Sequence, residues 1–78
     1  MPVPSLKTAI EILRDFDVES DSTSELRRAA SIVLANNIRP KDIMIAIDLI
    51  EDEDYDEAEE HIDKAIEDLE EIYKKRGY

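Results

Sequence analysis

Apolar residues recur at intervals of three and four along most of the chain, which is the period of an amphipathic α-helix. This pattern predicts four helices, at about residues 5–17, 23–36, 40–52 and 56–75. No segment shows the alternation of apolar and polar residues that is typical of a half-buried strand. The sequence therefore predicts an all-α protein.

Short polar segments mark where these helices begin and end. Ser22 lies three residues before Glu25, which is the spacing of a capping box at the start of the second helix. Asn36 and Asn37 tolerate the left-handed conformation that ends many helices, and the residue before Pro40 is disfavoured in a helix. We therefore expect the second helix to stop near residue 36 and the third to start near Pro40.

The third helix is apolar nearly all round, because only Asp48 interrupts the apolar residues from Ile43 to Ile50. Such a helix must lie centrally in the fold or against a partner. Short connections make successive helices antiparallel neighbours, so we predict one domain over residues 1–78, a small four-helix bundle of antiparallel helical hairpins. The predicted core comprises Leu13, Phe16, Ala30, Val33, Ile47, Ile50, Ile62, Ala65 and Leu69.

The stretch DYDEAEEHIDKAIEDL places Ala58, Ile62 and Ala65 in a small, large, small pattern. In this it resembles the second helix of a tetratricopeptide repeat, and the likeness covers residues 39–72. It departs from the repeat at Asp42, where an aromatic residue is usual, and at Glu70, where proline is usual. Residues 5–38 do not form a second copy, so we interpret the likeness as a shared helix-hairpin arrangement and assign no family.

The composition excludes several kinds of chemistry. The chain has no cysteine, one histidine and one glycine, Gly77. It therefore lacks thiolate catalysis, disulfides and cysteine-bound zinc, and it has no glycine loop to cradle phosphate or an oxyanion. His61 is interpreted as a partly exposed surface residue. We predict that the protein is not an enzyme and that it needs no cofactor.

Alternating acids at Asp52, Asp54 and Asp56 are similar to the start of a calcium-binding loop. The sixth position of such a loop is Glu57 where glycine makes the sharp turn, and the twelfth is Asp63 where a bidentate glutamate is required. No metal site is predicted. Asp54 or Asp56 is instead expected to cap the fourth helix.

Charge is distributed very unevenly around a net value of −11. Residues 1–39 carry five basic and six acidic side chains, whereas residues 40–78 carry five and fifteen. This charge disfavours direct binding to nucleic acid or to an anionic membrane. There is no apolar run long enough for a signal peptide or a membrane span, and with no cysteine the expected location is the cytoplasm.

Two functional hypotheses follow from the acidic C-terminal half. In the first, the protein is a non-enzymatic interaction module that docks a basic partner through Asp52, Asp54, Asp56, Glu57, Glu60, Asp63, Glu67 and Glu71. In the second, it is a nucleic-acid mimic that inhibits a DNA- or RNA-binding protein, since residues 56–71 carry about one acid per 2.7 Å of helix, against about 3.4 Å per phosphate along one DNA strand. The alternative to both is a charged surface that only keeps the protein soluble.

A separate apolar surface is predicted at Met44 and Ile45, which flank Asp48 on the side of the third helix away from Ile43, Ile47 and Ile50. If the first helix does not cover this side, two adjacent large apolar residues would suit a homodimer or a docking groove.

Overall fold

The computed structural model describes residues 5–76, and within that range it has four helices and no strand. The helices are α1 (Leu6–Asp15), α2 (Thr23–Ala35), α3 (Lys41–Glu51) and α4 (Tyr55–Lys75). The all-α fold class is confirmed, and each helix begins and ends within about two residues of its predicted bounds.

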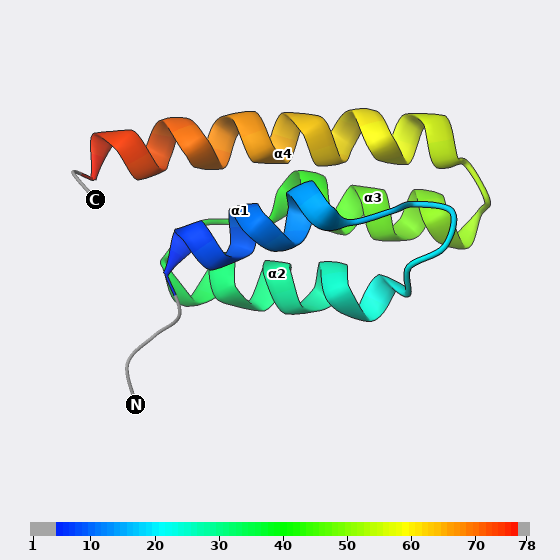
Figure 1. Cartoon of the computed structure of the whole chain (residues 1–78), viewed down its shortest axis with the longest axis horizontal. Coiled ribbons are helices and arrows are strands. Elements are labelled where there is room, and N and C mark those ends of the chain that lie inside the picture. The colour runs from blue at the N-terminus through cyan, green and yellow to red at the C-terminus, as the bar shows by residue number, and fades with distance from the viewer. Residues whose placement is uncertain (1–4, 77–78) are drawn as a thin grey trace.

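The four helices form a bundle in which each one packs against two neighbours. α1 contacts α2 and α4, and α3 contacts the same two helices from the other side, so α1 and α3 lie on one diagonal (Figure 1). α1 and α3 run in the opposite direction to α2 and α4 (Figure 1). The connections span only residues 16–22, 36–40 and 52–54, which is why successive helices are antiparallel.

The core is entirely apolar within the described residues. Seven of the nine predicted core residues are buried, but Phe16 and Ile50 are only half-buried and pack at its edge. Phe16 comes after the last residue of α1 and has extended backbone angles (φ −73°, ψ 128°), so its side chain leaves the apolar stripe of the helix. Ile50 lies in the last turn of α3, at the end of the bundle.

An alanine that is 0% exposed lies on every helix: Ala9, Ala29, Ala46 and Ala58. A methyl side chain at a helix contact lets the two backbones approach closely, and larger side chains then fill the remaining space. The largest of these, each under 2% exposed, are Leu6, Leu13, Leu26, Ile43 and Val33.

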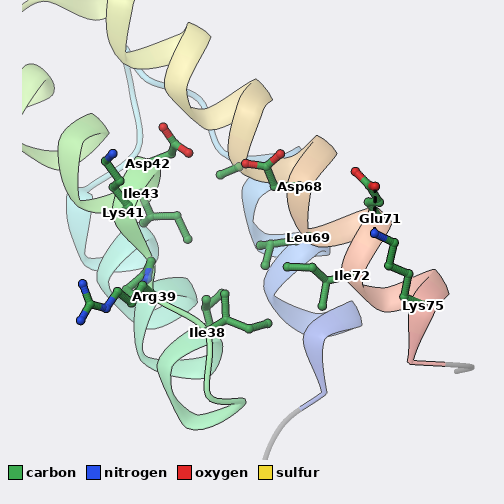
Figure 2. A pocket seen from close by; sticks show the side chains of 13 residues that line it. Ile38, Arg39, Lys41, Asp42, Ile43, Asp68, Leu69, Glu71, Ile72 and Lys75 are labelled. Carbon is green, nitrogen blue, oxygen red and sulfur yellow. Dashed lines mark ion pairs between the residues drawn. The ribbon is translucent and has the colours of Figure 1, made fainter.

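A groove of about 310 Å³ opens beside the last turns of α4, which extend past the start of α3. Its floor is apolar and includes Ile43 and Leu69. Figure 2 shows Arg39 and Lys41 on the α2–α3 side of the groove, with Asp68 across from them on α4. Among the described residues, the lining carries three acidic and three basic side chains, so its charges balance.

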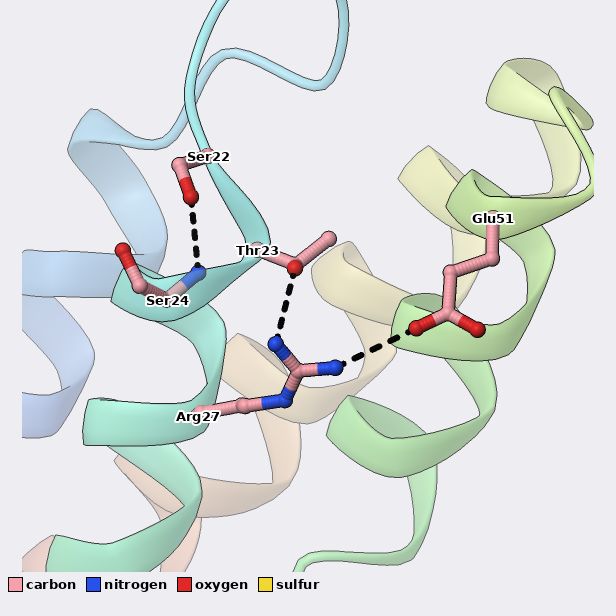
Figure 3. Close-up of polar contacts among 5 residues, drawn as sticks. All are labelled: Ser22, Thr23, Ser24, Arg27 and Glu51. Atoms are coloured by element: carbon pink, nitrogen blue, oxygen red, sulfur yellow. Dashed lines mark hydrogen bonds and ion pairs between the residues drawn. The ribbon is translucent and has the colours of Figure 1, made fainter.

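The start of α2 is capped as predicted, although through a different backbone group. The Ser22 hydroxyl accepts a hydrogen bond from the Ser24 N–H at 3.2 Å (Figure 3). One turn later, Arg27 donates to the Thr23 hydroxyl and forms an ion pair with Glu51 of α3, both at 3.2 Å (Figure 3). Both partners of this ion pair are more than half exposed, so it contributes at most about 1 kcal/mol.

Helices α2 and α3 end in the same way, with a residue in the left-handed conformation just after the helix. These residues are Asn37 (φ 64°) and Glu53 (φ 61°). In α2 the Asn37 N–H donates to the Leu34 carbonyl at 2.9 Å and the Ile38 N–H donates to the Val33 carbonyl at 3.2 Å, which is a Schellman motif. The corresponding distances after α3 are 3.0 and 2.8 Å. Asparagine suits this conformation, whereas glutamate is disfavoured there by about 1 kcal/mol.

Replacing Glu53 with glycine should therefore stabilise the protein by about 1 kcal/mol, which corresponds to a rise in Tm of about 4–8 °C for a domain of this size. Glu53→Gln is the matched control, because it removes the same charge but keeps the β-carbon. Thermal unfolding followed by circular dichroism measures both variants. An equal gain from the two variants would assign the effect to charge and contradict the conformational argument.

Ile47 is 3% exposed and sits among the core residues of α3. Truncation to alanine should cost about 2–5 kcal/mol, comparable to the whole net stability expected of so small a core. Urea unfolding should show a large loss or no folded state. Met44→Ala is the control on the same helix, since Met44 is 50% exposed and its truncation should change stability little. An unchanged Tm for Ile47→Ala would remove Ile47 from the core.

Candidate functional site

All eight residues of the predicted acidic surface are exposed, and five of them share one face of α4. Asp56, Glu60, Asp63, Glu67 and Glu71 follow one another at steps of four, three, four and four residues. At about 3.6 residues per turn these steps keep the side chains in a single row about 22 Å long. We call these five residues the acidic row.

The other three predicted residues lie outside the acidic row. Asp52 and Asp54 are in the α3–α4 connection, before the helix begins, and Glu57 is one residue round the helix from Asp56. Asp54 occupies the N-cap position of α4, as predicted, but its side chain makes no capping hydrogen bond. Asp52, Asp54 and Glu57 therefore lie near the N-terminal end of the acidic row.

Few cations neutralise the acidic row. Glu71 pairs with Lys75 at 3.3 Å in an exposed contact one turn along the helix. The remaining four acids of the row have no ion-pair partner within residues 5–76. Like charges three and four residues apart repel one another, so this surface opposes the stability of α4.

The opposite face of α4 supplies the core, through Ala58, Ile62, Ala65 and Leu69. α1 and α3 both pack against this helix, so the acidic row is carried on a backbone held from two sides (Figure 1). The row is thus a preformed surface, with the spacing of its carboxylates set by the helix.

His61 is partly exposed, as predicted, and it makes a contact that sequence analysis missed. Its Nδ1 lies 3.0 Å from Oδ1 of Asp42 on α3, and the Asp42 side chain is only 14% exposed. The two residues are nineteen positions apart, so no local pattern relates them. The contact joins the start of α3 to the middle of α4. Within residues 5–76, no three histidine, aspartate or glutamate side chains lie close enough together to hold a metal ion.

Met44 is 50% exposed and Ile45 is half-buried. α1 does not contact α3, so the first helix does not cover them. The structure adds Leu34, which is 62% exposed. Arg27 of α2 and Glu51 of α3 form an ion pair across the contact between these two helices. Leu34 lies seven residues after Arg27, and Met44 lies seven residues before Glu51. Seven residues are about two helical turns, so Leu34 and Met44 both lie on the α2–α3 seam two turns from that ion pair. This apolar pair is small compared with the surface that a stable dimer buries.

The α1–α2 connection is held by a short hydrogen-bonded turn around Asp17. Its Oδ1 accepts the N–H of Glu19 at 3.0 Å, and its own N–H donates to Oδ2 of Asp21 at 2.9 Å. The Glu19 N–H, followed by the Ser20 hydroxyl, lowers the pKa of Asp17 below its ordinary value, because both donors favour the charged carboxylate. Asp17 thus keeps its negative charge beside a second groove, of about 510 Å³, between this connection and α4.

The lowered pKa of Asp17 gives a prediction with a definite sign. A carboxylate whose pKa is lower in the folded state stabilises the fold above its unfolded-state pKa, and this stabilisation is lost as the pH falls through the folded-state value. Asp17→Asn should therefore lose stability at neutral pH, with the difference from the parent shrinking as the solution becomes acidic. Urea unfolding at a series of pH values measures it. A difference that does not change with pH would show that the carboxylate charge is not involved.

No family model, no curated protein and no solved structure matches this chain. None of the helices in residues 5–76 is long and apolar enough to cross a lipid bilayer.

Proposed function

We propose that this chain is a non-enzymatic helical interaction module whose acidic row docks a basic surface on a partner protein. The observation that supports this most directly is the row itself, five exposed carboxylates along one face of α4, of which only Glu71 forms an ion pair within residues 5–76. Capping accounts for acids at the start of the helix, where they favour its positive end. It does not account for Glu67 and Glu71, which approach the C-terminal end, where cations are favoured.

A basic partner would relieve the repulsion that the row creates in the free protein. Opposite charges across such an interface also accelerate encounter and disfavour wrong partners. Because α4 is held by α1 and α3, the partner would meet carboxylates whose spacing is set by an ordered helix, and no backbone segment of α4 would have to order on docking.

The overall charge density of α4 keeps nucleic-acid mimicry as a second candidate. The nine acids from Asp56 to Glu71 give this helix a number of charges per ångström comparable with that of one DNA strand. Within the acidic row, however, the axial spacing averages about 5.6 Å, compared with about 3.4 Å per phosphate of a strand. A duplex also presents two strands, whereas α4 presents one row, so the geometry favours docking to a basic protein surface.

Changing Glu60, Asp63, Glu67 and Glu71 together to glutamine should weaken binding to a basic probe and stabilise the free fold. A fluorescent lysine-rich peptide serves as the probe, with anisotropy read at low salt and at about 0.5 M salt, where exposed charges more than about 4 Å apart are largely screened from one another. Parent affinity should fall steeply with salt, and parent Tm should rise with it. Binding that survives both the quadruple change and high salt would exclude the acidic row and favour the apolar pair of Leu34 and Met44.

A matched control separates the acidic row from net charge. It converts four exposed acids elsewhere to their amides and changes the net charge by the same amount: Glu11, Asp15, Glu25 and Asp48. The control should lose much less affinity than the row variant, and equal losses would show that the peptide senses only total charge.

Fluorescent duplex DNA bound to a basic DNA-binding protein tests mimicry, which predicts that the parent displaces the DNA.

A further inference from the structure

The groove between the α1–α2 connection and α4 combines a small apolar floor with an acidic rim. Its volume is about 510 Å³. Phe16, Val18 and Ile66, all half-buried, contribute to the floor. Four acids line the rim: Asp17 and Glu19 from the connection, and Glu59 and Asp63 from α4. We call this cavity the Phe16 groove.

The cation in the lining of this groove is already engaged elsewhere. The guanidinium of Arg14 contacts the Glu70 carboxylate of α4. Within residues 5–76, none of the four rim acids has an ion-pair partner. The groove therefore carries an uncompensated negative charge, in contrast to the balanced groove beside the end of α4 (Figure 2).

Phe16 also lines a neighbouring groove between α1 and α2, so this residue borders two grooves. It is the one phenylalanine of the chain, and the structure places it at the edge of the core with part of its surface accessible. An aromatic face beside carboxylates attracts a cation in two ways, through the ring quadrupole and through the charges.

We infer that the Phe16 groove binds an arginine side chain of a basic partner protein. The aliphatic stem of arginine would lie on Phe16, Val18 and Ile66, and its guanidinium would reach the rim acids. Arginine suits this mixed lining better than lysine, because its planar guanidinium stacks on aromatic faces and can donate two parallel hydrogen bonds to one carboxylate. The inference rests on the proposed function and specifies it, since Asp63 belongs both to the acidic row and to this rim.

Two peptides of equal charge test the inference, acetyl-GRGRGRG-amide and acetyl-GKGKGKG-amide, titrated at low salt into ¹⁵N-labelled protein. The arginine peptide should bind about threefold more tightly than the lysine peptide, as expected for an exposed cation–π contact. Amide shifts should concentrate at residues 16–19 and 59–66. Phe16→Leu keeps an apolar side chain but removes the ring, so it should abolish the preference for arginine. Equal affinities in the parent, or a preference that survives Phe16→Leu, would overturn the inference.

A second pair of variants avoids the core. Glu19→Gln with Glu59→Gln removes two rim charges and should weaken arginine-peptide binding about fivefold. Asp48→Asn with Glu53→Gln makes the same charge change outside both the groove and the predicted acidic surface, and it should weaken arginine-peptide binding much less. Equal losses would overturn the inference.

The outcomes also separate this inference from the proposed function. The separating variant changes Glu60, Glu67 and Glu71 to glutamine and leaves Asp63, which the row and the rim share. If both peptides bind equally and only this triple change weakens them, the acidic row is the docking surface and the Phe16 groove is not. If the rim variant weakens binding and the triple variant does not, the Phe16 groove is the binding site and the acidic row is not. If neither peptide binds at low salt, both proposals are wrong.

Discussion

Close apolar packing around four buried alanines is the constraint on which the structure depends. Ala9, Ala29, Ala46 and Ala58 put a minimal side chain on each helix where neighbouring helices meet, and no polar or charged side chain is buried among the described residues. With no cysteine in the chain, disulfides do not reinforce this core. It must therefore outweigh the chain entropy and the repulsion of a net charge of −11 by apolar burial and backbone hydrogen bonding.

Because the core is wholly apolar, the surface charges contribute little to specifying the fold, and they are free to serve another purpose. α4 shows this separation most clearly, since one face supplies Ala58, Ile62 and Leu69 to the core and the other carries the acidic row. Its 21 residues make it the longest helix described in residues 5–76, and packing on two sides fixes its position. The proposed docking surface is thus built on the most extended rigid element described.

The net charge of each half of the sequence does not reveal that part of the acidic surface comes from the N-terminal half. Residues 1–39 are nearly neutral in sum, because their basic side chains almost balance their acids. In three dimensions Arg14 contacts Glu70 and Arg27 pairs with Glu51, so two of these cations are directed toward acids of the C-terminal half. Asp17 and Glu19 then remain beside Glu59 and Asp63, and the acidic surface extends from α4 onto the α1–α2 connection.

Local patterns in the sequence determined the four helices, the left-handed stop at Asn37 and seven of nine proposed core residues, because helix periodicity and capping involve only a few neighbouring residues. Helix periodicity also assigned Phe16 to the apolar stripe of α1, one residue beyond the end of the helix. The spacing of apolar residues does not indicate where the backbone leaves the helix. Contacts between distant residues, such as His61 with Asp42, depend on which helices become neighbours. That choice comes from how whole faces pack together, so only the tertiary structure decided that α1 leaves Met44 uncovered and that Phe16 lies among acids from two segments.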